Sequence, residues 1–399
     1  MTLGTVSVGS RVSQVFDRCM RIIRMRPLLR LPLVAALHCA FLALLPVDSI
    51  AASDGVRITG PGTPPQLDFA CCEQSVAQSQ TFLADPAVIA LLRALHSRLA
   101  VAIVDFSPQR TALIRHLNQA GIPVVAWILL PKDQGYYLNA DTAPHAVARI
   151  AAFEQWTRDN HLEWSAVGLD IEPDFTLLAA LKAHPGQLIA TLLDRCFDTA
   201  RMNRAGATYS TLIAQLQAHG YVVQTYQMPY LPAERRAHST LPDRLLGTID
   251  VRGNEEYLML YTSAARPIGA AMIWSLGPHA QFIAIGSTDG AGTPGPPAGP
   301  LDWNEFSRDL IVAGHFSRRI GIYDLEGCIR QGFLPRLQSF NWSQSVELSS
   351  TSIRRAQRIS ILLPTVLFVL SYSPWFLLAL VVLIAFLLWR RHNRKAMPC

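Results

Sequence analysis

The sequence lacks the short motifs that mark several common enzyme classes. It contains no glycine-rich phosphate loop, no H-E-x-x-H metal motif and no serine nucleophile elbow. No C-x-x-C pair occurs among its seven cysteines, and its eleven histidines are scattered without forming a convincing metal set. We therefore expect no bound metal and no other cofactor. Carboxylates and aromatic residues remain as the candidates for catalysis and binding.

Charged residues are absent from one long stretch near the C-terminus. Ile361–Trp389 contains no Asp, Glu, Lys or Arg, and a basic tail follows it. About 20 apolar residues are enough to span a bilayer, so we predict a transmembrane helix over residues 359–390. The positive-inside rule then predicts that the basic tail, residues 391–399, is cytoplasmic.

The N-terminal residues 1–51 combine six arginines with a shorter apolar run, Leu31–Val47. The run fits either the core of a cleaved signal peptide or a retained signal anchor, and the sequence leaves both alternatives open. In either case the middle of the chain is predicted to lie outside the cytoplasm, on the periplasmic side of the inner membrane. The bilayer is thus an expected partner.

The formal net charge of +6 belongs to these two ends. Between Ala52 and Ile353 the chain carries 22 Lys and Arg against 27 Asp and Glu, so the exported part is mildly acidic. It offers no basic footprint for nucleic acid. The adjacent Cys71 and Cys72 are expected not to bond to each other, and structural roles are the preferred interpretation of the cysteines.

From about residue 67 onward, short apolar segments alternate with amphipathic ones. The strand candidates are Leu67–Cys71, Leu99–Phe106, Pro123–Leu130, Ala166–Glu172, Tyr221–Met228, Tyr257–Tyr261, Ala270–Leu276 and Arg319–Leu325. The helix candidates are Pro86–Ser97, Gln109–Ala120, Ala143–Asn160, Gly186–His219 and Trp303–Phe316. Eight strands alternating with helices predict an α/β fold, a (β/α)8 TIM-like barrel over residues 67–342.

Connectors are predicted on both sides of this barrel, at residues 52–66 and 343–358. Phe282–Gly286 is either a ninth strand or part of an excursion after the seventh. The stretch Gly290–Pro300 is rich in glycine and proline, and is predicted to be either a lid or a solvated loop. An open doubly wound sheet is the rival fold, but it would be expected to carry a glycine-rich loop after its first strand.

Two carboxylates end the fourth predicted strand. Residues two apart on an extended chain point to the same face, so Asp170 and Glu172 should project side by side. Pro173 then ends the strand because it cannot donate to the sheet. Since barrel enzymes place their active sites at the carboxyl ends of the strands, this pair is the leading candidate for catalysis.

Other polar and aromatic residues stand at predicted strand ends. The candidates for substrate binding are Asp105, Trp127, Gln224, Tyr226, Trp274 and Asp324, and those for catalysis besides the pair are Tyr261 and Glu326. Aromatic faces stack on sugar rings, and carboxylates and amides bind hydroxyls, so this set indicates a glycan site. Each residue also has a structural alternative, as a core aromatic, a helix cap or half of an ion pair.

Three short segments resemble chitinase-like glycoside hydrolases. Gly168–Glu172 resembles the end of an Asp-x-Asp-x-Glu signature, Met259–Tyr261 resembles a Met-x-Tyr element, and Gly269–Trp274 is similar to the segment that supplies a floor tryptophan. The chain departs from the pattern at Gly168, where the family has an acid, and at Thr262, where an acid or amide is usual.

The resemblance implies roles for these residues. Glu172 would be the general acid, Asp170 would orient a substrate N-acetyl group that attacks the anomeric carbon, and Tyr261 would assist. Without such a group a second carboxylate is needed, for which Glu326 is the first choice and Asp324 the reserve. A non-catalytic glycan-binding or scaffold barrel, and a metal-dependent phosphodiester or deacetylase barrel, are the other functions considered.

Overall fold

The computed structural model describes residues 55–73, 76–174, 192, 194–290 and 299–395, with side chains up to residue 372. The chain divides into two compact units. The larger unit, Ile50–Pro232 with Pro242–Ser360, contains the barrel and every site residue discussed below. The predicted N-terminal segment and most of the loop Gly290–Pro300 lie outside the described residues.

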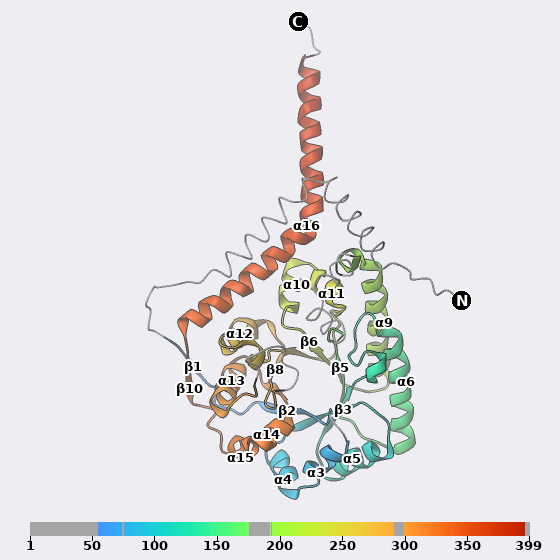
Figure 1. The fold of residues 1–399 in the computed structure, drawn as a ribbon, viewed down its shortest axis with the longest axis vertical. Coiled ribbons are helices and arrows are strands. Elements are labelled where there is room, and N and C mark those ends of the chain that lie inside the picture. Colours follow the sequence, from blue (N-terminus) through green and yellow to red (C-terminus); the bar gives the residue numbers. More distant parts are fainter. Residues whose placement is uncertain (1–54, 74–75, 175–191, 193, 291–298, 396–399) are drawn as a thin grey trace, which may run out of the picture. The chain divides into compact units, whose positions relative to one another are not determined.

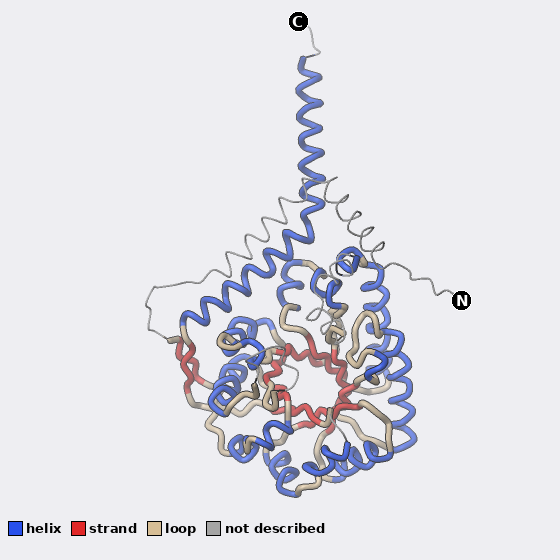
Figure 2. The backbone as a smooth tube through the Cα atoms, viewed as in Figure 1, coloured by secondary structure: helices blue, strands red, loops and turns tan. Residues whose placement is uncertain are grey.

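Eight parallel strands close into a barrel, as the sequence predicts (Figure 2). Their bounds are β2 Gln66–Cys71, β3 Arg98–Ile103, β4 Val124–Ile128, β5 Ala166–Asp170, β6 Val223–Gln227, β7 Glu255–Met259, β8 Phe282–Gly286 and β9 Arg319–Tyr323. Each strand pairs with its neighbours in the chain, and β2 pairs with β9 to complete the ring. The doubly wound alternative is therefore excluded.

The described chain also contains helices, of which those in the larger unit surround the ring of strands (Figure 1). Their bounds are α3 Val76–Leu83, α4 Pro86–Ala94, α5 Pro108–Gln119, α6 Ala143–Asn160, α9 Thr199–Ala218, α10 Leu231–Ala237, α11 Leu241–Leu246, α12 Gly269–Leu276, α13 Trp303–Phe316, α14 Leu325–Arg330, α15 Phe333–Gln338 and α16 Ser350–Lys395. Short 3-10 turns occur at η2 Lys132–Gln134, η3 Thr262–Ala265 and η4 Gly277–His279.

Helix starts follow ordinary capping chemistry. Ser107 accepts from the N–H of Arg110 ahead of α5, whose first residue is Pro108. Asp302 and Glu305 form a reciprocal capping box at the start of α13. The bounds of α6 and α13 are those predicted from the sequence.

The seventh strand of the barrel differs from the prediction. Ala270–Leu276 is not a strand but most of helix α12, and the seventh strand is β8, Phe282–Gly286. Both segments are mainly apolar, with Ser275 as the one polar residue, so hydrophobicity alone does not separate a buried helix from a buried strand. The small residues Gly269, Ala270 and Ala271 are buried in α12, which packs closely against α13.

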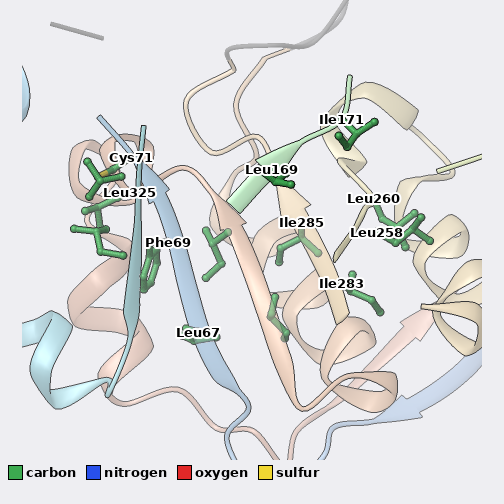
Figure 3. Packing of buried hydrophobic residues seen from close by; sticks show 14 of the residues in the cluster. Leu67, Phe69, Cys71, Leu169, Ile171, Leu258, Leu260, Ile283, Ile285 and Leu325 are labelled. Atoms are coloured by element: carbon green, nitrogen blue, oxygen red, sulfur yellow. The ribbon is translucent and has the colours of Figure 1, made fainter. Parts of the chain in front are cut away.

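Alternate residues of each strand face the helices or the barrel interior. The outward residues form the main apolar layer, in which Leu67, Phe69 and Cys71 project from one side of β2 (Figure 3). A separate inner cluster includes Ala102, Trp127 and other residues of β3, β4 and β5. This alternation is what turns Asp170 inward while its neighbour Leu169 packs outward.

Buried ion pairs fill the amino end of the barrel. Arg98 donates to both carboxylate oxygens of Asp68, at 3.0 and 2.5 Å, and to Glu255 at 2.9 Å. Tyr257 also donates to Asp68, and Arg319 pairs with Glu255. Burial, the largest single effect, would raise the pKa of Glu255, but the hydrogen bond and charge of Arg98, together with hydrogen bonds from Arg319 and Gln224, outweigh it and lower that pKa. Charges that pair in this way satisfy one another inside the barrel.

The two predicted connectors contain a pair of short strands. β1, Val56–Thr59, pairs in antiparallel fashion with β10, Ser345–Leu348. Helix α16 begins two residues after β10 and includes the span predicted at residues 359–390. In the described part of the chain, no helix has the length and apolar character that a membrane crossing requires.

The adjacent cysteines are bonded to each other, contrary to the expectation from their spacing. Cys71 ends β2, and its disulfide joins it to Cys72. Both residues are buried, and Cys72 has a positive φ of 72°. The peptide of Cys72 is held on both sides, because its N–H donates to Glu326 at 2.7 Å and its carbonyl accepts from Arg110 at 3.0 Å.

Candidate active site

The predicted carboxylate pair lies at the carboxyl end of β5. After Asp170 the chain continues in extended form, because Ile171 makes an isolated parallel bridge with Leu138. Ile171 joins Leu169 in the outer apolar layer, so Asp170 and Glu172 face inward together (Figure 3). Their side chains are hydrogen-bonded to each other.

Both carboxyl groups have pKa values above their ordinary range. Burial raises the pKa of Asp170 to about 7, although the indole N–H of Trp127 donates to its Oδ2 at 3.0 Å. The pKa of Glu172 lies well above its ordinary value, first because of burial and then because of the charge of Asp170. The Oδ1 atom of Asp170 is buried and receives no hydrogen bond from a donor group among the described residues. Two carboxyls this close do not both ionise at neutral pH, so the pair holds a removable proton.

Aromatic rings line the interior around this pair. Tyr261 stacks on Tyr323 with ring centroids 5.3 Å apart, and Tyr323 meets Trp127 edge to face at 6.3 Å. Burial, followed by the charges of nearby carboxylates, raises the pKa of both Tyr261 and Tyr323 well above the ordinary value. Their hydroxyls therefore stay protonated and available as hydrogen-bond donors.

Two further tyrosines come from the loop after β4. Tyr136 and Tyr137 contact each other edge to face at 5.0 Å, and the pKa of each is raised by burial and by the charges of Glu73, Asp170 and Glu172. Sequence reasoning missed them because they lie beyond η2, several residues past the strand end. The sequence did offer one signal for them, namely two adjacent tyrosines shortly after a predicted strand end.

Glu73 is the most important residue that sequence reasoning missed. Its Oε1 accepts from the hydroxyl of Tyr136 at 2.6 Å, and its Oε2 accepts from that of Tyr323 at 2.7 Å. After burial, its negative charge is among the causes that raise the pKa of Asp170 and Glu172, which places it close to the pair. Glu73 follows β2 as Glu172 follows β5, so the strand-end rule would have found it.

The ring of Tyr226 explains why Gly168 departs from the chitinase-like pattern. A Cβ at this position would lie 2.8 Å from Cε2 of Tyr226 and 3.2 Å from its hydroxyl oxygen. Tyr226 in turn donates to Gln224 at 2.8 Å, which fixes its ring in the barrel. The interior volume that an acid at position 168 would need is thus occupied by the Tyr226 ring.

Replacing Gly168 with Ala should therefore lower the free energy of unfolding by about 1–3 kcal/mol, because a methyl group is forced against a held ring. Gly206→Ala in α9 is the matched control, since its Cβ would meet only Ile249 at 4.0 Å. In that helix the same change should stabilise by about 0.5–1 kcal/mol. Urea denaturation measures both, and equal effects at the two sites would contradict the steric explanation.

Trp274 does not lie where the sequence places it. It belongs to helix α12 and packs against His315 and Phe316 of α13, with centroids 5.3 and 5.2 Å away. The predicted position at the end of a strand is therefore wrong. The tryptophan that contacts the carboxylate pair is Trp127 of β4.

The remaining predicted residues have structural partners. Asp105 accepts from the N–H of Ser107 and pairs with Arg110 at 3.1 Å. Gln224 is buried between Tyr226 and Glu255, to which it donates at 2.7 Å. Among the described residues, neither side chain therefore makes a hydrogen bond or ion pair with Asp170 or Glu172.

Asp324 and Glu326 lie at the start of α14. Asp324 caps this helix by accepting from the N–H of Gly327 at 2.8 Å, and burial, Glu326 and Asp289 raise its pKa to about 8. One oxygen of Glu326 accepts from the N–H of Cys72, as described above. Both acids thus lie at the correct end of the barrel, but each is engaged with the backbone.

A metal centre is not evident at this site. Among the described residues, no group of three or more His, Cys, Asp or Glu side chains is arranged to hold a metal ion. The carboxyls and phenols of the site are able to transfer protons and to form hydrogen bonds.

Comparison with known proteins gives only remote similarity. No protein-family model and no curated protein matches the sequence. Among solved structures, a D-allulose 3-epimerase from Methylomonas sp. is 15% identical, with a TM-score of 0.39 over 78% of this chain and 100% of that chain. The PgaB (BpsB) glycoside hydrolase domain from Bordetella bronchiseptica is 10% identical, with a TM-score of 0.42 over 69% of this chain and 98% of that chain. The chain thus has a remote resemblance to a TIM-barrel glycoside hydrolase domain.

Proposed function

We propose that the barrel hydrolyses glycosidic bonds of a cell-envelope or extracellular glycan by carboxylic acid catalysis. The observation that supports this best is the hydrogen-bonded carboxyl pair Asp170 and Glu172 at the carboxyl end of the barrel, in which burial raises both pKa values. A carboxyl that is still protonated near neutral pH can donate to a glycosidic oxygen. The surrounding tyrosines and Trp127 add aromatic faces suited to sugar rings.

Glu172 is the proton donor in this proposal, and Asp170 positions it. Asp170 is only 2% exposed and its Oδ2 accepts from Trp127, so it has little freedom to reach a substrate. Glu172 lies one step nearer the open end of the barrel and is partly exposed. As the bond to the leaving group breaks, the proton of Glu172 passes to the departing oxygen. Glu172 is left as a carboxylate beside Asp170 and takes up a new proton from solvent before the next turnover.

Glycan binding without catalysis is the second candidate. Thr262, which replaces the acid or amide of the chitinase-like pattern, donates its hydroxyl to the buried Asp309 of α13. It is committed to that contact, and Gly168 offers no side chain. A barrel with these two positions altered could hold a sugar against its aromatic rings without cleaving it.

Measured hydrolysis of a glycan distinguishes the proposed hydrolase from a glycan-binding protein. The full-length chain, extracted from the membrane fraction with detergent, is incubated with a panel of envelope glycans and aryl glycosides, and released reducing ends are measured. Hydrolysis of one member supports the proposal. Binding without turnover across the panel would contradict it and favour the second candidate. The same preparation tests membrane anchoring, because recovery of the chain from the soluble fraction would contradict anchoring through Ile361–Trp389.

The activity should depend on pH through the proton of Glu172. Because the pKa of Glu172 is raised well above its usual value, its acid form persists at a pH where an ordinary carboxyl is ionised, and it is lost as the pH rises through that raised pKa. Asp170→Asn removes a neighbouring charge that raises the pKa of Glu172. The alkaline limb of kcat/KM should then move to lower pH by about one unit. An unmoved limb would contradict the coupling.

A further inference from the structure

Glu73 reaches the interior from across the barrel. It follows β2, and in the closed order of strands β3 and β4 lie between β2 and β5 on the shorter way round the ring. Glu73 therefore approaches the barrel axis from a different side than Asp170 and Glu172 do. Hydrolysis of a glycosidic bond uses two carboxyl groups that flank the bond in just such a way.

The hydrogen bonds of Glu73 differ from those of the pair. Both of its oxygens accept hydrogen bonds, from the hydroxyls of Tyr136 and Tyr323. The pKa of each of these phenols is raised, by burial first and then by Glu73 itself, so both phenols keep their protons and act as donors. Glu73 thus accepts at both oxygens, and each oxygen retains a second lone pair for a further partner such as water.

The backbone that carries Glu73 is held in place. Cys72 precedes it, and the peptide groups of Cys72 are bonded to Glu326 on one side and to Arg110 on the other. Arg110 is fully buried, and its guanidinium also pairs with Asp105. Glu326, the second carboxylate expected from the sequence, thus supports the turn from which Glu73 projects.

We propose that Glu73 is the second catalytic carboxylate of this barrel, acting opposite Glu172. The inference rests on the proposed hydrolase function and deepens it. Glu172 gives its proton to the glycosidic oxygen, and the bond from that oxygen to the anomeric carbon breaks. A water molecule forms the new bond to that carbon, and Glu73 takes the proton that the water releases. No substrate N-acetyl group is required, so glycans without one are substrates.

The test compares Glu73→Gln, Glu73→Ala and Glu163→Gln in the full-length chain, using a glycoside that the wild type hydrolyses. Glu163 is exposed and precedes β5, so its change is a matched control. We expect kcat to fall by about 10²–10⁴-fold in both Glu73 variants and to stay unchanged in Glu163→Gln. Sodium azide should restore turnover to Glu73→Ala with formation of a glycosyl azide, because azide attacks without losing a proton.

Each outcome decides the matter. Azide rescue with the glycosyl azide product supports the role of Glu73. Wild-type activity in Glu73→Gln, while Glu172→Gln is inactive, overturns this role and leaves the hydrolase function standing. A loss in both Glu73 variants that azide does not restore, or that follows a lowered thermal midpoint, makes the residue structural and also overturns the role. A wild type without turnover on any glycoside overturns both proposals.

Discussion

Glu172→Gln should lower kcat on an unactivated glycan by about 10³-fold and leave KM close to its wild-type value. General acids contribute about 10²–10⁴-fold to such reactions, and glutamine keeps the size of the side chain while removing the proton that it donates. The loss falls on kcat because proton transfer to the leaving oxygen occurs in the transition state, whereas sugar binding depends on the aromatic rings around the site.

Glu163→Gln is the control for this result as well, because it makes the same chemical change at an exposed position before β5. It should leave both kinetic constants unchanged. The thermal midpoint of Glu172→Gln should not fall, since the neutral amide, like the protonated acid that it replaces, can donate a hydrogen bond to Asp170. A decrease in kcat of less than tenfold would contradict the assignment of Glu172 as the acid.

Asp68→Ala should lower the free energy of unfolding by about 3–5 kcal/mol, the largest effect on stability that we predict. Asp68 is buried and accepts two hydrogen bonds from Arg98 and one from Tyr257. Its removal leaves the Arg98 guanidinium, which is also buried, with Glu255 as its remaining carboxylate partner. A partly unpaired charge inside the barrel cannot be hydrated as it is in the unfolded chain, so the folded state is destabilised.

Asp85→Ala provides the comparison for this change. Asp85 is exposed and caps α4 by accepting from the N–H of Ala87 at 2.8 Å. Loss of such a cap costs about 1 kcal/mol. Chemical denaturation of both variants measures the difference, and a cost for Asp68→Ala no larger than that for Asp85→Ala would contradict the buried network as a major source of stability.

The sequence predicted the architecture well because barrel strands are buried on both faces. Seven of the eight predicted strands overlap the observed ones, including β5 with its inward pair. The seventh failed because Ala270–Leu276 and Phe282–Gly286 are similar in hydrophobicity, and only packing against α13 decides which of them is a helix. Composition contains no information about that contact.

The candidate site was predicted less completely. Asp170 and Glu172 were found because two-residue spacing on a strand fixes a common face. Glu73 was missed because its importance depends on hydroxyls from Tyr136 and Tyr323, which are 63 and 250 positions away in sequence. Contacts of that kind form only when the ring of strands closes. The bonding of Cys71 to Cys72 likewise depends on the turn that follows β2.

The most direct test of the central claim is the dependence of Glu172→Gln on the leaving group. Aryl glycosides of the sugar that the wild type accepts are compared, one carrying phenol and one carrying 2,4-dinitrophenol. Dinitrophenolate leaves without a proton, so kcat/KM of the variant should be close to wild type on that substrate. On the phenyl glycoside it should be about 10³-fold lower. An equal loss on both substrates would contradict Glu172 as the proton donor.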